Sequence, residues 1–257
     1  SLGIIQPGNI TKVLALLLIW YALLQAGVPV DELSVPVPAD QAQSDVSDME
    51  ASPSTRAPAA TIAAQARVLS GKVVAIDPGH GGTETGAIGV AGSREKDNAL
   101  AAALAIKRVL EEVGVRVVLT REGDHEPNLE LLDQGAALSD RLQQRVRIAA
   151  QAKADVFISI HNDWNPNPAL TGTTTYYWGS PRLAQCVQDA LVNRLGGRSV
   201  GAIRKGFYVV VEAPMPAVLV ELGFLSNAEE EKLLCSEWYH TLAGEGIRDG
   251  LASYFGR

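Results

Sequence analysis

Two of the four histidines in the chain, His80 and His161, stand at the ends of short apolar runs that predict buried strands. Glu221 lies at the end of a third such run, and Glu95 follows the first one. Two imidazoles and one carboxylate are typical ligands of a catalytic zinc, which keeps a further position open for water. A carboxylate that does not bind the metal can take the proton of that water and pass it to the leaving group. These residues predict a zinc hydrolase, in which one glutamate binds the metal and the other moves the proton.

The glycine-rich stretch that contains His80 could also suggest a phosphate-binding loop, but its spacing excludes one. Glu84 stands where a dinucleotide-binding motif needs its third glycine, and Ala87 stands where a P-loop needs its lysine. We expect these glycines to let the backbone pass close beside His80. The remaining histidines, His125 and His240, fall in a polar loop and a helix and are expected at the surface.

The elements that position these residues follow a strand–helix alternation from Gly71 onward. Expected strands cover 72–77, 115–120, 155–160, 172–178, 207–211 and 217–222, and expected helices begin after Asp97, Ser180, Asn227 and Ser236. The strands are continuously apolar rather than alternating, which is typical of strands that are buried on both faces. The fold class is therefore α/β, a single domain with a mostly parallel twisted sheet of about six strands and helices on both faces. The carboxyl ends of parallel strands meet at one sheet edge, where ligands bind, so the candidate residues should converge there.

The first seventy residues have a different composition. Residues 13–30 are uncharged, follow Lys12 and span roughly 27 Å as a helix, so residues 1–30 are expected to be a signal peptide or a membrane anchor. Residues 31–70 are rich in Pro, Ser, Ala and Asp, and we expect them to form a disordered acidic linker. The folded domain is expected to cover 71–257 and to lie outside the cytoplasmic membrane, either secreted or anchored.

The charge and cysteine content exclude other classes of protein. The formal net charge is −7, which argues against binding to nucleic acid. Only two cysteines are present, so neither a disulfide-stapled scaffold nor a Cys₄ zinc ribbon is available. Cys186 and Cys235 fall on expected helices and could either be bridged or remain small apolar residues. We expect the chain to be a monomer.

Four segments of the chain resemble the zinc-dependent N-acetylmuramoyl-L-alanine amidases of bacterial cell walls. They read, in order, VVAIDPGHGG, SREKDNAL, ADVFISIHND and PAVLVELGFLSNAEEEKLL. The similarity covers roughly residues 72–255. It implies one zinc per chain with His80, Glu95 and His161 as ligands, and Glu221 as the catalytic glutamate. It also implies the substrate, the peptidoglycan amide between the lactyl group of N-acetylmuramic acid and L-alanine. Glu84 is the alternative carboxylate for the metal.

Two other functions remain open at this stage. A zinc carboxypeptidase-like hydrolase would also present two histidines and a carboxylate, together with an arginine pair that clamps a terminal carboxylate, and no such pair is evident beside these motifs. A catalytically inactive wall-binding module would lack one of the four site residues, and all four are present. Trp164, which follows the second histidine motif, is expected to touch the substrate.

Overall fold

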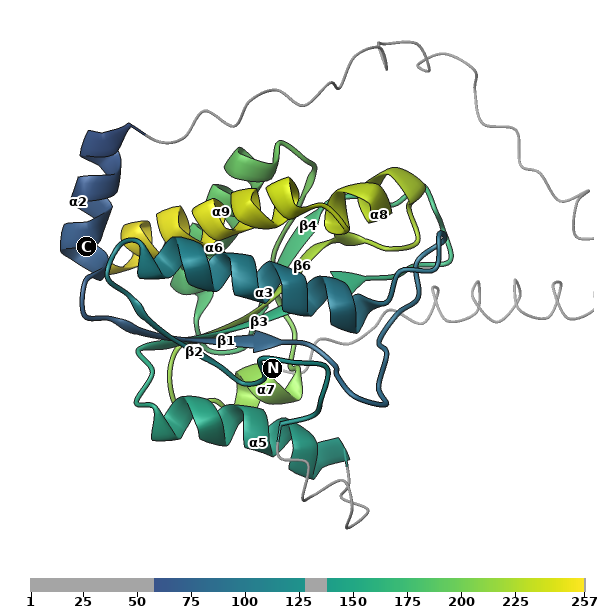
Figure 1. The fold of residues 1–257 in the computed structure, drawn as a ribbon, viewed down its shortest axis with the longest axis horizontal. Helices are drawn as coiled ribbons and strands as arrows, with labels where there is room; N and C mark the ends of the chain where they lie inside the picture. Colours follow the sequence, from purple (N-terminus) through teal and green to yellow (C-terminus); the bar gives the residue numbers. More distant parts are fainter. Residues whose placement is uncertain (1–57, 128–137, 257) are drawn as a thin grey trace, which may run out of the picture. The chain divides into compact units, whose positions relative to one another are not determined.

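A computed structural model describes residues 58–127 and 138–256 of the chain (Figure 1). The expected signal or anchor segment, residues 13–30, lies outside these ranges, as does most of the expected linker. Within the described ranges, no helix is both long enough and apolar enough to cross a membrane.

A mixed sheet forms the centre of the fold. Its strands are β1 (Val73–Pro78), β2 (Arg116–Leu119), β3 (Val156–Asp163), β4 (Thr173–Tyr177), β5 (Ser199–Arg204) and β6 (Ala217–Phe224). In the described part of the chain, these six strands lie in the order β2-β1-β3-β6-β4-β5. The first four in this order are mutually parallel, whereas β4 runs antiparallel to β6 and β5 runs parallel to β4. The prediction of a single mostly parallel α/β sheet is confirmed.

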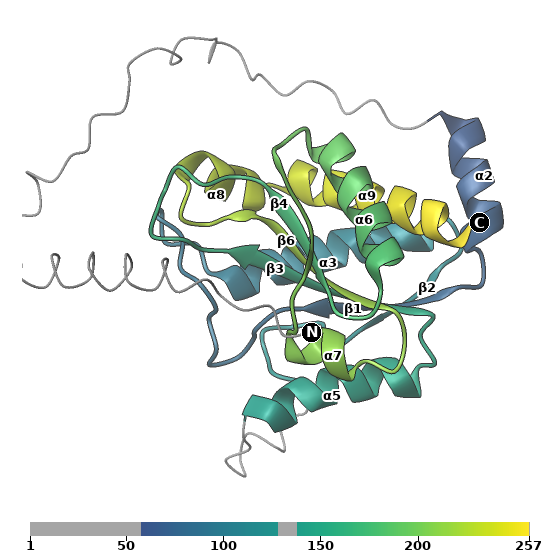
Figure 2. The ribbon, with the colours of Figure 1, turned by 180° about the vertical axis from the view of Figure 1, so that it is seen from behind.

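Helices cover both faces of the sheet (Figures 1 and 2). One face carries α3 (Glu95–Glu111), α6 (Pro181–Leu195) and α9 (Glu237–Phe255), and α8 (Ala228–Leu234) follows β6. The other face carries α5 (Leu138–Gln151) and the short α7 (Tyr208–Glu212). The central strands β1, β3 and β6 are buried almost throughout, which explains their continuous apolar sequences.

The register of the central strands brings the candidate residues to one edge. β1 and β3 are parallel neighbours, and β3 pairs with β6 so that His161 lies opposite Glu221. A register shift separates His161 from Asp163, at the end of that ladder. Residues that are far apart in the sequence therefore meet at the carboxyl ends of three adjacent strands.

The start of α3 differs from the expected one. Asp97 was expected to cap this helix, but the helix begins at Glu95, with Arg94 in the N-cap position. The side chain of Asp97 instead forms an ion pair with Arg94 (Nε–Oδ2 2.5 Å). The difference matters because it places Glu95 in the first turn of a helix rather than in a flexible loop.

The expected strand at 207–211 is wrong. Tyr208–Glu212 form the helix α7, in which Val209 and Val210 are buried against the α5 face of the sheet. β-Branched residues favour strands only where a pleated surface is available to them, and here the packing under the sheet decides the conformation. The edge strand β5 was not expected, because its exposed residues and Gly201 give it no apolar alternation.

The expected linker is also wrong over its last residues, where Ala59–Leu69 form the helix α2. This segment is rich in alanine, which favours a helix. Leu69 is fully buried, and the side chain of Gln65 donates to Asp249 of α9 at 2.7 Å. The folded domain therefore includes α2 and begins before Gly71.

Two smaller expectations are settled by the packing. Cys186 and Cys235 are both free, so the bridge left open above is absent. His240 of α9 is buried rather than exposed, and the Nε2 atom of its ring lies 2.6 Å from the carbonyl of Leu234, at the end of α8. A histidine on a helix can face the core when a backbone carbonyl is available to its ring.

Candidate metal centre

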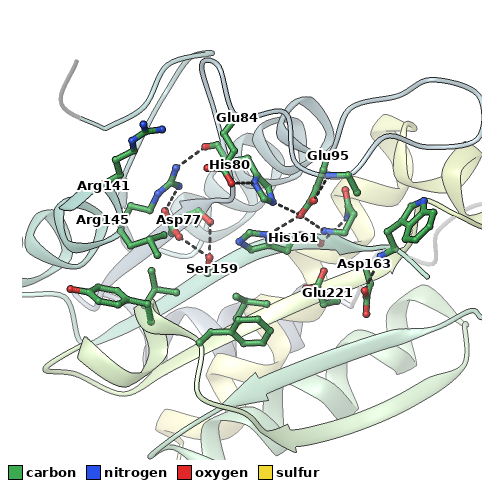
Figure 3. Close-up of a pocket in the computed structure, with 18 of the residues that line it drawn as sticks. Asp77, His80, Glu84, Glu95, Arg141, Arg145, Ser159, His161, Asp163 and Glu221 are labelled. Atoms are coloured by element: carbon green, nitrogen blue, oxygen red, sulfur yellow. Dashed lines mark hydrogen bonds and ion pairs between the residues drawn. The ribbon is translucent and has the colours of Figure 1, made fainter. Parts of the chain in front are cut away.

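Three side chains converge at the carboxyl edge of the sheet. The Oε1 atom of Glu95 lies 2.9 Å from Nε2 of His80 and 2.8 Å from Nδ1 of His161 (Figure 3). Potential ligand atoms of the three residues all lie within 4.8 Å of one another. The residues come from the loop after β1, from the first turn of α3 and from β3. Two imidazoles and a carboxylate thus face one point, as expected from the sequence.

The backbone at His80 is held in an unusual conformation. His80 has a φ of +57°, in the left-handed region that non-glycine residues rarely occupy. Its carbonyl accepts a hydrogen bond from Nη2 of Arg145 at 2.7 Å. Such conformations persist when the surrounding structure fixes them. Arg145 therefore holds the chain where the His80 ring can reach Glu95.

Two glycines leave the room that the three side chains need. A Cβ atom at Gly79 would lie 2.3 Å from the ring of His161. At Gly86, whose φ is +66°, a Cβ atom would lie 2.6 Å from both Glu95 and His80. The close passage of the backbone beside His80 is confirmed, and it extends to the other two members of the group.

Glu84 contacts the group from outside. Its Oε1 atom lies 3.1 Å from Nδ1 of His80, the ring nitrogen that points away from Glu95. Burial lowers the pKa of His80, but hydrogen bonds to Glu84 and Glu95 outweigh it and raise that pKa to about 9. Glu84 thus orients the His80 ring, and among the described residues the convergent group contains Glu95 and not Glu84.

Glu95 is a buried carboxylate surrounded by donors. Its Oε2 atom accepts from the amide of Ala87 at 2.9 Å, and Oε1 also accepts from the amide of Asn162 at 3.2 Å. Burial raises the pKa of Glu95, but hydrogen bonds from His161 and His80 hold it well below the usual range. The side chain is therefore ionised and fixed, as a metal ligand must be.

Glu221 lies beside the group without belonging to it. The residue is 9% exposed, and its buried Oε2 atom has no hydrogen-bond partner within the described part of the chain. Burial raises the pKa of Glu221 well above the ordinary value, with further contributions from the charges of Glu95 and Asp163. A buried carboxyl group with a raised pKa is suited to accept and release a proton.

These side chains line a cavity of about 420 Å³. Glu221, Asp163 and Trp164 form part of its wall, and Arg141, Leu142 and Arg145 of α5 form another part. Trp164 is half exposed, at 50%. The cavity is thus open to solvent and large enough to take part of a polymeric substrate.

A buried polar network beneath the cavity was missed in the sequence. The carboxylate of Asp77 accepts hydrogen bonds from Thr120, Ser159 and Arg145 at 2.5 to 2.8 Å. Arg121 donates hydrogen bonds to the carbonyls of Pro78 and Gly79. Arg145 donates hydrogen bonds to the carbonyls of Pro78 and His80. Both arginines therefore hold the loop that carries His80. Asp77 lies near the carboxyl end of β1 and Arg121 lies just beyond that of the neighbouring parallel strand β2, and this position was a signal that could have identified them.

The donor set fits a divalent metal. Nitrogen and carboxylate ligands in this combination suit zinc. A second carboxylate, that of Glu221, stands next to them, and its Oε2 atom has no partner among the described residues. The arginine pair expected of a carboxypeptidase-like site does not form. Arg141 and Arg145 both line the cavity, but Arg145 is already bound to Asp77 and Glu126. An inactive wall-binding module would lack at least one of the four site residues, but the chain contains His80, Glu95, His161 and Glu221.

Comparison with known proteins agrees with this geometry. Residues 74–253 match a family model described as N-acetylmuramoyl-L-alanine amidase. The chain is 34% identical over 197 residues to the germination-specific N-acetylmuramoyl-L-alanine amidase of Bacillus subtilis, covering 73% of this chain and 81% of that protein. It is also 37% identical over 202 residues to the uncharacterized protein YqiI of the same organism, covering 76% and 91%.

A solved structure shows the same fold. The catalytic domain of CwlV, an N-acetylmuramoyl-L-alanine amidase from Bacillus (Paenibacillus) polymyxa, superposes with a TM-score of 0.64 at 38% identity. The match covers 72% of this chain and 98% of that domain. The likeness therefore extends over nearly the whole described fold.

Proposed function

The chain belongs to the N-acetylmuramoyl-L-alanine amidase family of peptidoglycan hydrolases, and from this premise we propose that it uses one zinc ion to hydrolyse an amide bond of peptidoglycan. The proposed ligands are His80, Glu95 and His161, and the proposed proton carrier is Glu221. The bond cleaved is the amide between the lactyl group of N-acetylmuramic acid and L-alanine. Zinc is supported by the donor set, two imidazoles and one carboxylate around a single point.

The observation that carries the assignment of Glu221 is its unpartnered oxygen. A buried polar atom without a hydrogen bond is rare and calls for an explanation. Oε2 of Glu221 lies in the cavity wall, on the strand next to the one that carries His161. A water or a substrate nitrogen in the cavity would supply the missing partner.

The chemistry divides between the metal and the chain. Zinc, when bound, would polarise the scissile carbonyl and lower the pKa of a water molecule. Glu221 takes the proton of the attacking water and then gives it to the nitrogen of the departing alanine. His80 and Glu95 keep their positions during this exchange, because Glu84 and Arg145 hold His80 and the amide of Ala87 holds Glu95. His161 is held by its contact with Glu95.

The place of action follows from the substrate. Peptidoglycan lies outside the cytoplasmic membrane, so we propose that this domain works there. Residues 13–30 would serve as its signal peptide or its membrane anchor.

The test combines metal content with wall digestion. Glu221→Gln should keep its zinc while amidase activity falls by a factor of 10² or more. His80→Ala and His161→Ala should each lose zinc after mild chelation, and Glu84→Ala is the matched carboxylate control that should keep the metal. New amino-terminal L-alanine in digested wall identifies the bond cleaved. A zinc-loaded Glu221→Gln protein with full activity would reassign the proton carrier, and unchanged zinc in both histidine variants would refute the ligand set.

A further inference from the structure

Arg141 is a cation of the cavity wall whose Nε atom has no hydrogen-bond partner among the described residues. It stands on α5, four residues before Arg145, so the two arginines lie on the same face of that helix. Arg145 is fully engaged, with hydrogen bonds to two carboxylates and two carbonyls. The Nε atom of Arg141 is buried and has no hydrogen-bond partner within the described residues. In Figure 3 its guanidinium carries no dashed line.

The rest of the wall is strongly acidic. The carboxylates that line the cavity are those of Asp77, Glu84, Glu95, Glu126, Asp163 and Glu221. These carboxylates repel an anionic group at most positions in the cavity. The side chains of His80 and His161 already contact the carboxylate of Glu95. The guanidinium of Arg141 is always protonated, and its planar fork matches a carboxylate. The position beside Arg141 is therefore the part of the wall that favours an anionic group of a ligand.

The two ends of the cavity differ in charge. Figure 3 shows Arg141 and Asp163 at opposite ends, with His80, Glu95 and His161 between them. Glu221 lies toward the Asp163 end in Figure 3, and the exposed Trp164 directly follows Asp163 in the chain. A substrate that spans the site thus meets the guanidinium of Arg141 on one side of the metal ligands, where Arg145 neutralises Asp77 and Glu126. On the other side it meets two carboxylates and an indole, with the charge of Lys205 close to Asp163.

We propose that Arg141 binds a carboxylate of the stem peptide, and so directs the peptide toward α5 and the sugar toward Asp163. This inference rests on the proposed function. On the alanine side of the scissile amide, the next residue of the stem is a D-glutamate linked through its side chain, and its α-carboxyl group is either free or amidated. One turn of α5, roughly 6 Å, separates Arg141 from the arginine that holds His80. The neutral sugar goes to the end where a carboxylate would be repelled.

The test uses two substrates that differ in one group. Soluble disaccharide–tripeptides are prepared with the α-carboxyl of D-glutamate either free or amidated, and kcat/KM is measured for the zinc-loaded full-length protein. The wild type should prefer the free carboxylate. Arg141→Gln should lower kcat/KM for that form roughly 10- to 100-fold, as expected for a lost charge-assisted hydrogen bond, and change the amidated form by less than about twofold. Arg141→Lys should give a partial loss, because lysine keeps the charge without the fork.

The controls separate this subsite from the catalytic centre. Arg147 is exposed on the same helix and does not line the cavity, so Arg147→Gln should behave as wild type on both substrates. Zinc content and the unfolding midpoint of Arg141→Gln should equal those of the wild type. Both compounds are also tested as inhibitors of wall digestion, so that discrimination is measured as an inhibition constant where turnover is slow.

Equal kcat/KM of the wild type on the free and the amidated substrate would overturn the proposal. An equal loss of kcat/KM on both substrates in Arg141→Gln would also overturn it. Failure of both compounds to bind or be cleaved would overturn it as well. Failure of the proposed function would look different: the wild type would then release no amino-terminal L-alanine from intact wall.

Discussion

At the scale of single residues, the candidate metal centre depends on a strained loop and on the space left around it. His80 occupies a left-handed backbone conformation, and Arg145 holds its carbonyl. Gly79 and Gly86 leave no room for a side chain beside the rings and the carboxylate.

Gly86→Ala tests this requirement for space. Its Cβ atom would press on Glu95 and His80, so we expect zinc content to fall well below one per chain. Gly92→Ala is the matched control: Gly92 also has a positive φ, of +90°, but nothing lies within 4 Å of the new Cβ atom. Both variants carry similar backbone strain, of order 1–2 kcal/mol, and only Gly86→Ala should lose metal. Equal zinc in both would show that the crowding is relieved by small shifts.

The folded domain should lose stability at acid pH because of Asp77. Burial raises the pKa of Asp77, but the charge of Arg145 and hydrogen bonds from Thr120, Ser159 and Arg145 outweigh it and hold the pKa below its ordinary value of 3.8. A carboxyl group whose pKa is lowered by folding stabilises the fold above the unfolded pKa. That contribution is lost as the pH falls below about 3.8 toward the folded pKa.

Asp77→Asn removes this contribution. At neutral pH the variant should be less stable by about 3–5 kcal/mol, because Arg145 loses its buried partner. The difference from the wild type should shrink as urea unfolding is followed from neutral pH to about pH 3. Parallel pH curves for the two proteins would contradict the role of Asp77.

At the scale of elements, helix ends and short loops fix the site more than the strands do. α3 begins at Glu95, and the turn that leads into it is held from α8. The carboxylate of Glu231 accepts hydrogen bonds from the amide of Ala91 at 2.6 Å, and from the amide and hydroxyl of Ser93 at 3.0 and 2.6 Å. A helix remote in sequence thus fixes the loop that delivers a proposed metal ligand.

Glu231→Ala should loosen that loop. It removes the carboxylate that accepts from the partly buried amides of Ala91 and Ser93, which costs about 1–2 kcal/mol. We expect faster amide hydrogen exchange at residues 89–93 and weaker zinc binding, measured by competition with a chelator. Glu229→Ala is the control on the same helix, since Glu229 is exposed and pairs only with Lys232; it should cost less than about 0.5 kcal/mol. Unchanged exchange in Glu231→Ala would mean that the turn is stable without α8.

At the scale of the whole domain, the chain enters the sheet on the side away from the site. α2 leads into the start of β1, whereas the cavity follows the carboxyl ends of β1, β3 and β6. α2 packs on α9 through Leu69 and the hydrogen bond from Gln65 to Asp249. This helix contributes to stability and supplies no residue to the cavity.

A protein that begins at Pro58 should therefore be more stable than one that begins at Gly71. Loss of the buried Leu69 alone should cost about 2–3 kcal/mol. We expect Tm to fall by roughly 5–10 °C, while activity on soluble fragments at low temperature stays the same. In the longer protein, Leu69→Ala should reproduce most of the loss, and Arg67→Ala, at an exposed position, should not. Equal Tm values for the two starting points would show that α2 does not stabilise the domain.

Much of this protein could be read from the sequence because the relevant signals are local. Continuous apolar runs separated by amphipathic segments predict a mostly parallel sheet with helices on both faces. His80, His161 and Glu221 each follow such a run, and parallel strands bring their ends together. The same reasoning fails at Tyr208–Glu212, where a β-branched run is too short to fix its own conformation and packing makes it a helix.

The tertiary structure alone decided which side chains meet. The sequence places both Glu84 and Glu95 after the first strand and leaves Glu84 as the alternative ligand, but only Glu95 reaches both histidines, because α3 begins at that residue. The antiparallel course of β4 also depends on contacts between distant segments, and so does the Nε atom of Arg141, which is buried without a partner among the described residues. A local pattern sets the conformation of a segment and the face that it buries. The distance between two side chains depends instead on how whole elements pack, and that is set by all their contacts together.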